Sequence, residues 1–205
     1  MSPRPTFRRP FACVVPLVAA VLLAGCDKQT PAEPQPQSTA PAVAAAAKGE
    51  DGGEGSFNGT LDISNRGAAM PDLTFTDPSG KKLRTLDLKG KPLLINLWAT
   101  WCGPCVLEMP TLDALSAAKA GKLTVLTISQ DLDQAAAVDA FFKDRKLAHL
   151  APWLDPDNAL SQHYGTGVLP TTVLYDAQGR EVWRMIGSHD WSGPRTDAML
   201  ADTLR

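Results

Sequence analysis

The sequence lacks an uninterrupted apolar run of the roughly eighteen residues that a membrane-spanning helix needs. It also lacks an excess of positive charge, because 20 Lys and Arg are set against 22 Asp and Glu. Without an excess of positive charge the chain has no electrostatic attraction to the phosphates of nucleic acid, so no nucleic-acid partner is expected. No glycine-rich dinucleotide motif and no internal repeat is present. At 205 residues, the chain has room for one well-buried domain with attached segments.

Cysteine is scarce, and two of the four cysteines lie in or directly after a segment typical of an export signal. Basic residues at 4–9, an apolar stretch at 11–23 and the run Leu23-Ala-Gly-Cys26 resemble the lipobox of bacterial lipoproteins, which is cut just before a cysteine that carries lipid. We therefore expect a lipoprotein signal peptide at 1–25, lipidation of Cys26, and loss of Cys13 with the signal. Asp27 resembles the signal that keeps lipoproteins of enteric bacteria at the inner membrane. An ordinary secretory signal is the alternative, and the sequence leaves Sec or Tat export open.

Residues 26–60 are expected to form a tether. They are mostly Pro, Ala, Gln, Gly and Glu, with almost no large apolar side chain, and such a composition cannot bury a core. A lipid-anchored tether of this length would hold a folded domain tens of ångströms from the bilayer. A disordered arm that binds a partner is the alternative, and the composition fits both.

The remaining residues, 61–205, alternate strand and helix signals. Apolar runs at 92–98 and 123–129 are typical of strands buried on both faces, and helical patterns follow each of them. A short helix at 158–164, a hairpin over 171–186 and a closing helix near Pro194 complete the pattern. Two short strand patterns around the turn at 77–80 predict an opening hairpin. This order predicts an α/β domain with a mixed central sheet flanked by helices.

Cys102 and Cys105 are the two cysteines left to explain, and they lie where a buried strand gives way to a helix. A thiol in the first helical turn faces free N–H groups and the positive end of the helix dipole, which stabilise its thiolate. We therefore expect Cys102 to be the nucleophile and Cys105 to be the resolving thiol. A structural disulfide across so short a loop would remove little chain entropy. A zinc site would need further ligands at tight spacing, and the three histidines are scattered.

The block Asn96-Leu-Trp-Ala-Thr-Trp-Cys-Gly-Pro-Cys-Val-Leu-Glu-Met-Pro110 resembles the thioredoxin superfamily, specifically its membrane-attached thiol–disulfide oxidoreductases of the TlpA and ResA type. The resemblance extends from about residue 70 to the end and implies a thioredoxin fold with an added N-terminal β-hairpin. It also implies that Pro170 is a cis-proline facing the cysteines, and that the residue before it offers backbone groups to an extended substrate. The substrate-binding residues that it implies are Trp101, Gly103, Pro104, Leu169 and Pro170.

Glu108 follows Cys105 by three residues and therefore projects from the same helical face. Its apolar neighbours indicate partial burial with a raised pKa, and the resemblance implies that it takes or returns the proton of Cys105. A solvated surface charge is the alternative. Asn96 stands where thioredoxin has a buried Asp, and it cannot accept a proton. Trp98 and Trp101 are expected to pack around the site and shape the groove, whereas the acids at 131 and 133 and the loop at 188–191 are assigned no role.

These features predict a lipid-anchored thiol–disulfide oxidoreductase at the periplasmic face of the bacterial inner membrane, expected to reduce disulfides in exported proteins. In the family that it resembles, the clients are apocytochrome c or the thiols of a copper-centre protein. The expected electron donor is a transmembrane thiol relay of the DsbD or CcdA type. Beyond the Cys102–Cys105 disulfide, no cofactor and no metal is expected. The alternatives are a copper-binding chaperone that uses both cysteines as ligands, and a disulfide oxidase or isomerase.

The lipobox generates the first testable prediction. Mass spectrometry of the mature protein should find an N-terminal Cys26 that carries lipid acyl chains, because cleavage before this residue exposes the modified cysteine. A mature chain that is released in soluble form with an unmodified N-terminus would contradict the anchoring hypothesis.

Overall fold

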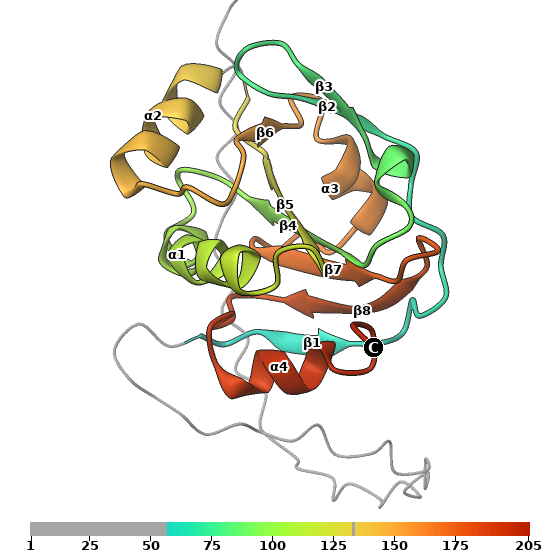
Figure 1. The fold of residues 1–205 in the computed structure, drawn as a ribbon. Coiled ribbons are helices and arrows are strands. Elements are labelled where there is room, and N and C mark those ends of the chain that lie inside the picture. Colours follow the sequence, from blue (N-terminus) through green and yellow to red (C-terminus); the bar gives the residue numbers. More distant parts are fainter. Residues whose placement is uncertain (1–56, 133) are drawn as a thin grey trace, which may run out of the picture. The chain divides into compact units, whose positions relative to one another are not determined.

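The computed structural model describes residues 57–132 and 134–205, so the predicted signal peptide, Cys26 and most of the predicted tether lie outside the described residues. A mixed eight-stranded sheet has the order β1-β8-β7-β4-β5-β6-β2-β3 (Figure 1). The strands are β1 (Thr60–Asp62), β2 (Thr74–Thr76), β3 (Lys82–Arg84), β4 (Leu93–Trp98), β5 (Thr124–Ser129), β6 (Trp153–Leu154), β7 (Thr171–Tyr175) and β8 (Glu181–Ile186). The helical segments are η1 (Thr85–Leu88), α1 (Gly103–Ala118), α2 (Ala135–Arg145), α3 (Ala159–Tyr164) and α4 (Pro194–Leu200). No described helix is long and apolar enough to cross a membrane.

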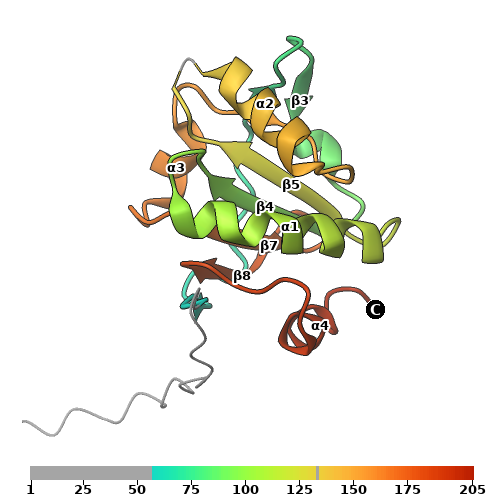
Figure 2. The same ribbon diagram turned by 90° about the vertical axis from the view of Figure 1, so that its left-hand side faces the viewer.

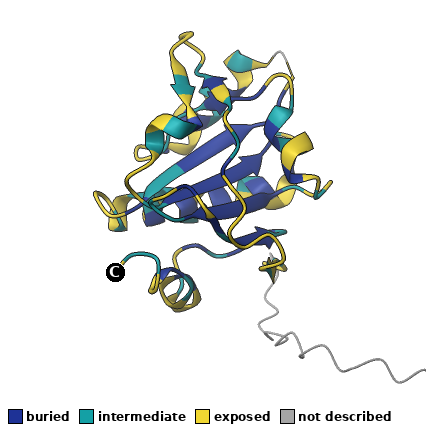
Figure 3. Cartoon of the chain, turned by 90° about the vertical axis from the view of Figure 1, so that its right-hand side faces the viewer, coloured by how far each residue is buried: buried dark blue, intermediate teal, exposed yellow. Residues whose placement is uncertain are grey.

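Strand β4 is the centre of the sheet, and all six of its residues are buried. It pairs in parallel with β5 and antiparallel with β7. Because side chains alternate along a strand, Leu94 and Trp98 enter one core with residues of α1, α2 and α4, whereas Leu93, Ile95 and Leu97 enter a second core with residues of α3. Figure 2 shows α1 and α2 on one face of the sheet, and Figure 3 shows buried central strands beneath exposed loops. The predicted mixed α/β thioredoxin fold is confirmed.

The described part of the chain opens with β1, which the sequence does not predict as a strand. It pairs antiparallel with β8 at one end of the sheet. Just before it, the Gly59 N–H donates to the Ser188 carbonyl at 2.7 Å. A side chain at Gly59 would approach the Met185 sulfur and two backbone oxygens to within 3 Å, so this close approach requires glycine. Thr60 therefore already belongs to a strand of the sheet, next to the expected start of the domain at Leu61.

Strands β2 and β3 pair antiparallel around the turn at 77–80, where the sequence predicts a hairpin. The Asp77 carboxylate accepts hydrogen bonds from the backbone N–H groups of Ser79 and Lys81, which is the usual way an aspartate stabilises such a turn. The hairpin joins the sheet through the pairing of Thr76 with Leu154 in β6. The sheet is thereby extended beyond its parallel strands.

Candidate active site

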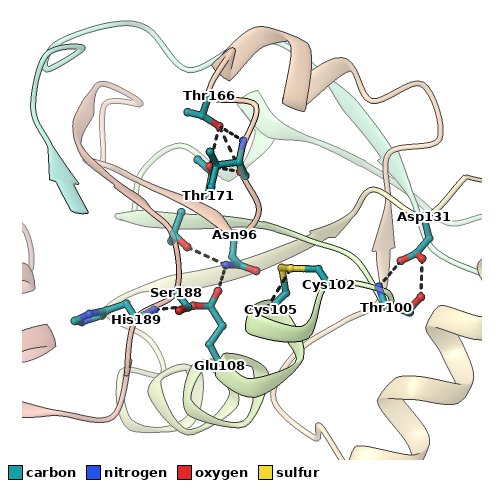
Figure 4. The surroundings of a disulfide bond; sticks show 12 residues. Asn96, Thr100, Cys102, Cys105, Glu108, Asp131, Thr166, Thr171, Ser188 and His189 are labelled. Carbon is teal, nitrogen blue, oxygen red and sulfur yellow. Dashed lines mark hydrogen bonds between the residues drawn. A yellow bond between two sulfur atoms is a disulfide. The ribbon is translucent and has the colours of Figure 1, made fainter. Parts of the chain in front are cut away.

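Cys102 and Cys105 form a disulfide at the start of α1, with 2.06 Å between the sulfurs and 5.3 Å between the Cα atoms (Figure 4). Cys102 is the N-cap residue, and its sulfur accepts a hydrogen bond from the Cys105 N–H at 3.3 Å. Pro104 fits the first turn because the N–H that it lacks would have no intrahelical partner there. The predicted position of the pair, between a buried strand and a helix, is confirmed.

The two cysteines differ in their access to solvent. Cys102 is 7% exposed, whereas Cys105 is completely buried. Gly103 and Pro104, which separate them, are both exposed. A substrate can therefore approach Cys102 more readily than Cys105, which favours Cys102 as the attacking thiol.

The loop that carries Cys102 is held by Asp131, to which the sequence analysis assigns no role. The Asp131 carboxylate accepts hydrogen bonds from the Thr100 backbone N–H at 2.9 Å and from the Thr100 hydroxyl at 2.6 Å (Figure 4). It also accepts one from the Ser129 hydroxyl at 2.7 Å. Because β4 and β5 are parallel, residues just beyond their carboxyl ends meet at one edge of the sheet. The position of Asp131 just after a buried parallel strand is therefore the feature of the sequence from which its role in positioning the cysteine loop could have been predicted.

The loop before β7 brings Pro170 to the end of β4. Leu97 pairs with Thr171, so continuing the antiparallel register places Pro170 opposite Trp98. The Leu169–Pro170 peptide bond is cis, as the resemblance implies. The cysteine loop and the Pro170 loop therefore leave the sheet from the same edge.

Leu169 has backbone groups free for a substrate. The neighbouring Val168 carbonyl accepts a hydrogen bond from the Thr171 hydroxyl at 2.7 Å, and that hydroxyl lies 2.9 Å from the Thr166 hydroxyl (Figure 4). Within the ranges that the structure describes, the Leu169 N–H and C=O have no hydrogen-bond partner. An extended polypeptide could pair with them as an added strand would.

Glu108 lies inside the protein and is completely buried. Its Oε1 accepts a hydrogen bond from the Asn96 side-chain amide at 2.7 Å, and its Oε2 accepts one from the His189 backbone N–H at 2.9 Å and one from the Trp191 indole N–H at 3.3 Å. Burial disfavours the charged carboxylate more than these bonds favour it, which raises the pKa of Glu108 to about 7. The prediction of a buried carboxyl is confirmed, and the alternative of a solvated surface charge is wrong.

His189 and Trp191 belong to the loop that the sequence analysis leaves without a role. The His189 ring packs edge-on against Trp191, with ring centroids 4.8 Å apart, and its Nε2 lies 3.0 Å from the Thr196 hydroxyl. Burial lowers the pKa of His189 to about 4, so its ring is neutral near neutral pH. The contacts with Glu108 join residues 81 and 83 positions apart. Local sequence patterns carry no signal of such a contact.

Asn96 links Glu108 to the disulfide region. Besides donating to Glu108, its Nδ2 donates to the Thr172 hydroxyl at 2.8 Å. Its Oδ1 is buried and has no hydrogen-bond partner among the described residues. In Figure 4 this oxygen points toward the disulfide. The free Oδ1 of Asn96 therefore faces the disulfide. In the reduced protein it could accept a hydrogen bond from the Cys105 thiol.

The two tryptophans near the cysteines behave differently from each other. Trp98 is buried and packs against Phe141 and Phe142, with ring centroids 4.9 and 5.8 Å away. Trp101 is 68% exposed, so the packing role expected of it is wrong, whereas its expected part in shaping the groove stays a prediction. It precedes Cys102 directly in the chain and offers a large apolar face to solvent, as residues that bind partners do.

The fold and the sulfur pair agree with the comparisons with known proteins. Residues 65–200 match the Redoxin family. The thiol–disulfide oxidoreductase ResA of Bacillus thuringiensis (strain Al Hakam) is 35% identical over 121 residues, which cover 59% of this chain and 69% of the relative. The exposed lipoprotein thioredoxin Etrx1 of Streptococcus pneumoniae strain TIGR4 is 26% identical with a TM-score of 0.55, over 65% of this chain and 98% of that chain. A thioredoxin-family thiol:disulfide interchange protein from Chlorobium tepidum TLS shares the fold, with a TM-score of 0.58, 21% identity, and coverage of 68% of this chain and 98% of that chain.

A fold of the thioredoxin superfamily with a sulfur pair at disulfide distance defines an oxidoreductase. The chain belongs to the Redoxin family and, within it, to the ResA-like thiol–disulfide oxidoreductases. Its substrates are accordingly molecules that carry disulfides.

Replacing Glu108 by Gln is expected to change how the stability of the oxidised protein depends on pH. The pKa of Glu108 is about 7 in the folded state against 4.5 for an ordinary glutamate, so between these values the folded protein holds a proton that the unfolded chain releases. The free energy of unfolding of the wild type should therefore fall as pH rises through this window, by up to about 3 kcal/mol. Glu108→Gln should lack this contribution.

Urea unfolding of both proteins from about pH 4 to pH 8 measures the difference. The opposite trend from His189, which loses stability as pH falls, is common to both proteins and cancels in the comparison. Parallel stability curves would contradict a buried proton on Glu108.

Proposed function

We propose that this protein is a lipid-anchored reductase of disulfides in exported proteins, working at the periplasmic face of the bacterial inner membrane. The observation that carries the proposal is the buried Glu108 carboxyl, joined through Asn96 to the region of a disulfide of which only Cys102 is accessible. A dithiol that delivers electrons must also release protons, and this carboxyl is a buried group able to take one.

The reaction starts from the reduced pair. The Cys102 thiolate attacks one sulfur of the substrate disulfide, forming a mixed disulfide and releasing the other substrate sulfur as a thiolate that takes up a proton. Cys105 then loses its proton and attacks the Cys102 sulfur. This step breaks the mixed disulfide, releases the second substrate sulfur as a thiolate that takes up a proton, and forms the Cys102–Cys105 disulfide. Two electrons pass from the protein to the substrate.

Glu108 receives the proton that Cys105 must lose. A carboxyl with a pKa of about 7 is partly ionised at neutral pH, and a base whose pKa lies near the working pH is efficient. Asn96 cannot take the proton itself, unlike the Asp that thioredoxin has at this position. Its free Oδ1 can accept a hydrogen bond from the Cys105 thiol while its Nδ2 holds Glu108, so it positions both groups.

The substrate segment binds beside the cis-proline. Its backbone pairs with the free N–H and C=O of Leu169. Trp101, Gly103 and Pro104, all exposed around Cys102, contact the substrate side chains. Backbone pairing accepts many sequences, which suits clients that are still unfolded.

The predicted lipobox supports the proposed anchoring, and the resemblance to the family supports the proposed clients. Etrx1, one of the similar proteins, is described as an exposed lipoprotein, which supports lipidation of Cys26 here. We propose apocytochrome c or a copper-centre protein as the client and a transmembrane thiol relay of the DsbD or CcdA type as the electron donor. In this scheme the Cys102–Cys105 pair is the only redox group that the protein needs.

The direction of electron flow is tested by the reduction potential. Gly103-Pro104 matches the dipeptide of thioredoxin, at about −270 mV, whereas the oxidant DsbA is at about −120 mV, a gap of about 7 kcal/mol for two electrons. We expect a value on thioredoxin's side of the midpoint, because a less stabilised Cys102 thiolate makes the protein a better electron donor. Equilibration with defined glutathione or dithiothreitol buffers measures it. A potential close to that of DsbA would mean an oxidase and would refute the reductase proposal.

The proton-accepting role of Glu108 is tested by kinetics. In Glu108→Gln, the step in which Cys105 resolves the mixed disulfide should slow by on the order of a hundredfold, and its pH profile should lose the inflection near pH 7. Alkylation of Cys102 by iodoacetamide is the control, since it does not require Cys105 to lose a proton. An unchanged pH profile of the resolving step would return Glu108 to a structural role.

A further inference from the structure

A cavity of about 440 Å³ lies beside the cysteine loop and is not used by the thiol chemistry. It reaches both loops of the active site, because Trp101 adjoins Cys102 and Leu169 adjoins Pro170 in the chain. The lining residues that matter here are Trp101, Gln130, Leu132, Asn158, Val168 and Leu169.

Two residues that line the cavity have side-chain amide oxygens without partners among the described residues. Gln130 is 6% exposed, and its Nε2 donates to the Asp155 carboxylate at 3.4 Å, which leaves its Oε1 as the free end of the amide. Gln130 Oε1 and Asn158 Oδ1 are both buried without a hydrogen-bond partner among the described residues. Buried acceptors in this state are uncommon and unfavourable. Each oxygen can therefore accept a hydrogen bond from an N–H group of a bound molecule.

The side-chain oxygen of Asn158 can accept a hydrogen bond from a bound group because it does not cap helix α3. It is the N-cap residue of α3, yet its side chain makes no capping hydrogen bond. Asp155 fills that role instead, accepting from the N–H groups of Ala159 and Leu160 at 3.1 and 2.9 Å. Asparagine is common at this position because its side chain usually caps the helix, and the Asn158 side chain does not do so here.

The charges near the cavity favour a cation. The Asp155 carboxylate accepts a hydrogen bond from the Gln130 side chain and is 4% exposed, and Asp131, the next residue after Gln130 in the chain, is 2% exposed. No Lys, Arg or His belongs to the described residues that line the cavity. Carboxylates at low exposure attract a positive group more strongly than they would in water.

The apolar part of the cavity suits the stem of a long basic side chain. Trp101, Leu132 and Val168 are 68%, 54% and 43% exposed, so they can pack on methylene groups, and the indole can stack on a cation. The amide oxygens are buried, so a bound side chain reaches them only after exposed neighbours change rotamer, which exposed side chains do readily.

We propose that this cavity binds a Lys or Arg side chain of the substrate polypeptide close to its reacting cysteine, and so selects among disulfide substrates. The inference rests on the proposed function, because it assumes that the substrate is a polypeptide disulfide. Arg and Lys carry only donors, which matches the two free acceptors, and their charge matches the carboxylates.

Synthetic peptides test the proposal. Each carries one cysteine as a mixed disulfide with thionitrobenzoate, and members of a series differ only in one residue flanking the cysteine: Arg, norleucine or Glu, placed on either side in turn. The reduced full-length protein is mixed with each peptide, and the coloured thiol is followed. We expect the Arg peptide to react about tenfold faster than the norleucine peptide at one of the two positions, and the Glu peptide to react more slowly than both.

Variants link this preference to the cavity. Gln130→Met keeps the volume of the side chain but removes the acceptor, and Asn158→Gly suits the positive φ of 52° at this position. Each should reduce the preference for Arg, and the double variant should abolish it. Gln162→Met makes the same chemical change on α3 but outside the cavity lining, and it should keep the wild-type preference. Should Gln130→Met fail to fold, Asn158→Gly carries the test alone.

The outcomes separate the two hypotheses. Equal rates for Arg, norleucine and Glu peptides would overturn the basic-side-chain site while leaving the reductase proposal intact. A preference for Arg that persists in the double variant would also overturn it, because the selection would then arise elsewhere. If the protein reduces none of the peptides, the proposed function itself fails.

Discussion

Burial of the Glu108 carboxyl is the constraint on which the rest of the active site depends. A buried carboxyl is costly unless its oxygens are hydrogen-bonded, and the three donors come from separate parts of the chain: Asn96 in β4, and His189 and Trp191 in the loop after β8. Satisfying one acid thus fixes the central strand, the first helix and the final loop against one another. The position of Cys105, one turn before Glu108 on α1, follows from that arrangement.

The site separates sulfur exchange at the surface from proton storage in the interior. Cys102 meets solvent beside exposed Trp101, whereas Cys105 and Glu108 are inaccessible. A substrate sulfur can therefore reach the first thiol while the charge change occurs at a low effective dielectric, where small shifts in geometry have large effects on pKa. Thioredoxin has a single buried Asp at the position of Asn96, whereas in this chain the amide and the carboxyl stand on different elements. The pairing of two residues lets one orient the thiol and the other hold the proton.

The central sheet and the sulfur pair could be predicted because their signals are local: the apolar run of β4, the helical spacing of α1 and two cysteines at the junction. Strands β1 and β6 have only three and two residues, too few for a pattern. Two of the donors to Glu108, His189 and Trp191, escaped prediction because they lie far along the chain, and nothing in a His-Asp-Trp loop indicates which buried acid it meets. The exposure of Trp101 was misjudged because an aromatic beside a reactive cysteine fits both a core and a binding surface.

The hydrogen bond that Gly59 makes at the start of β1 has an electronic consequence. The carbonyl of Ser188 that accepts it and the His189 N–H that donates to Glu108 belong to a single peptide group. A bond at one end of a peptide group polarises it and strengthens the bond at the other end, so the two contacts are cooperative. Strand β1 therefore helps to set the proton affinity of Glu108. Mechanical tension that pulled β1 from the edge of the sheet would weaken the hydrogen bond from the His189 N–H and so destabilise the negatively charged carboxylate of Glu108.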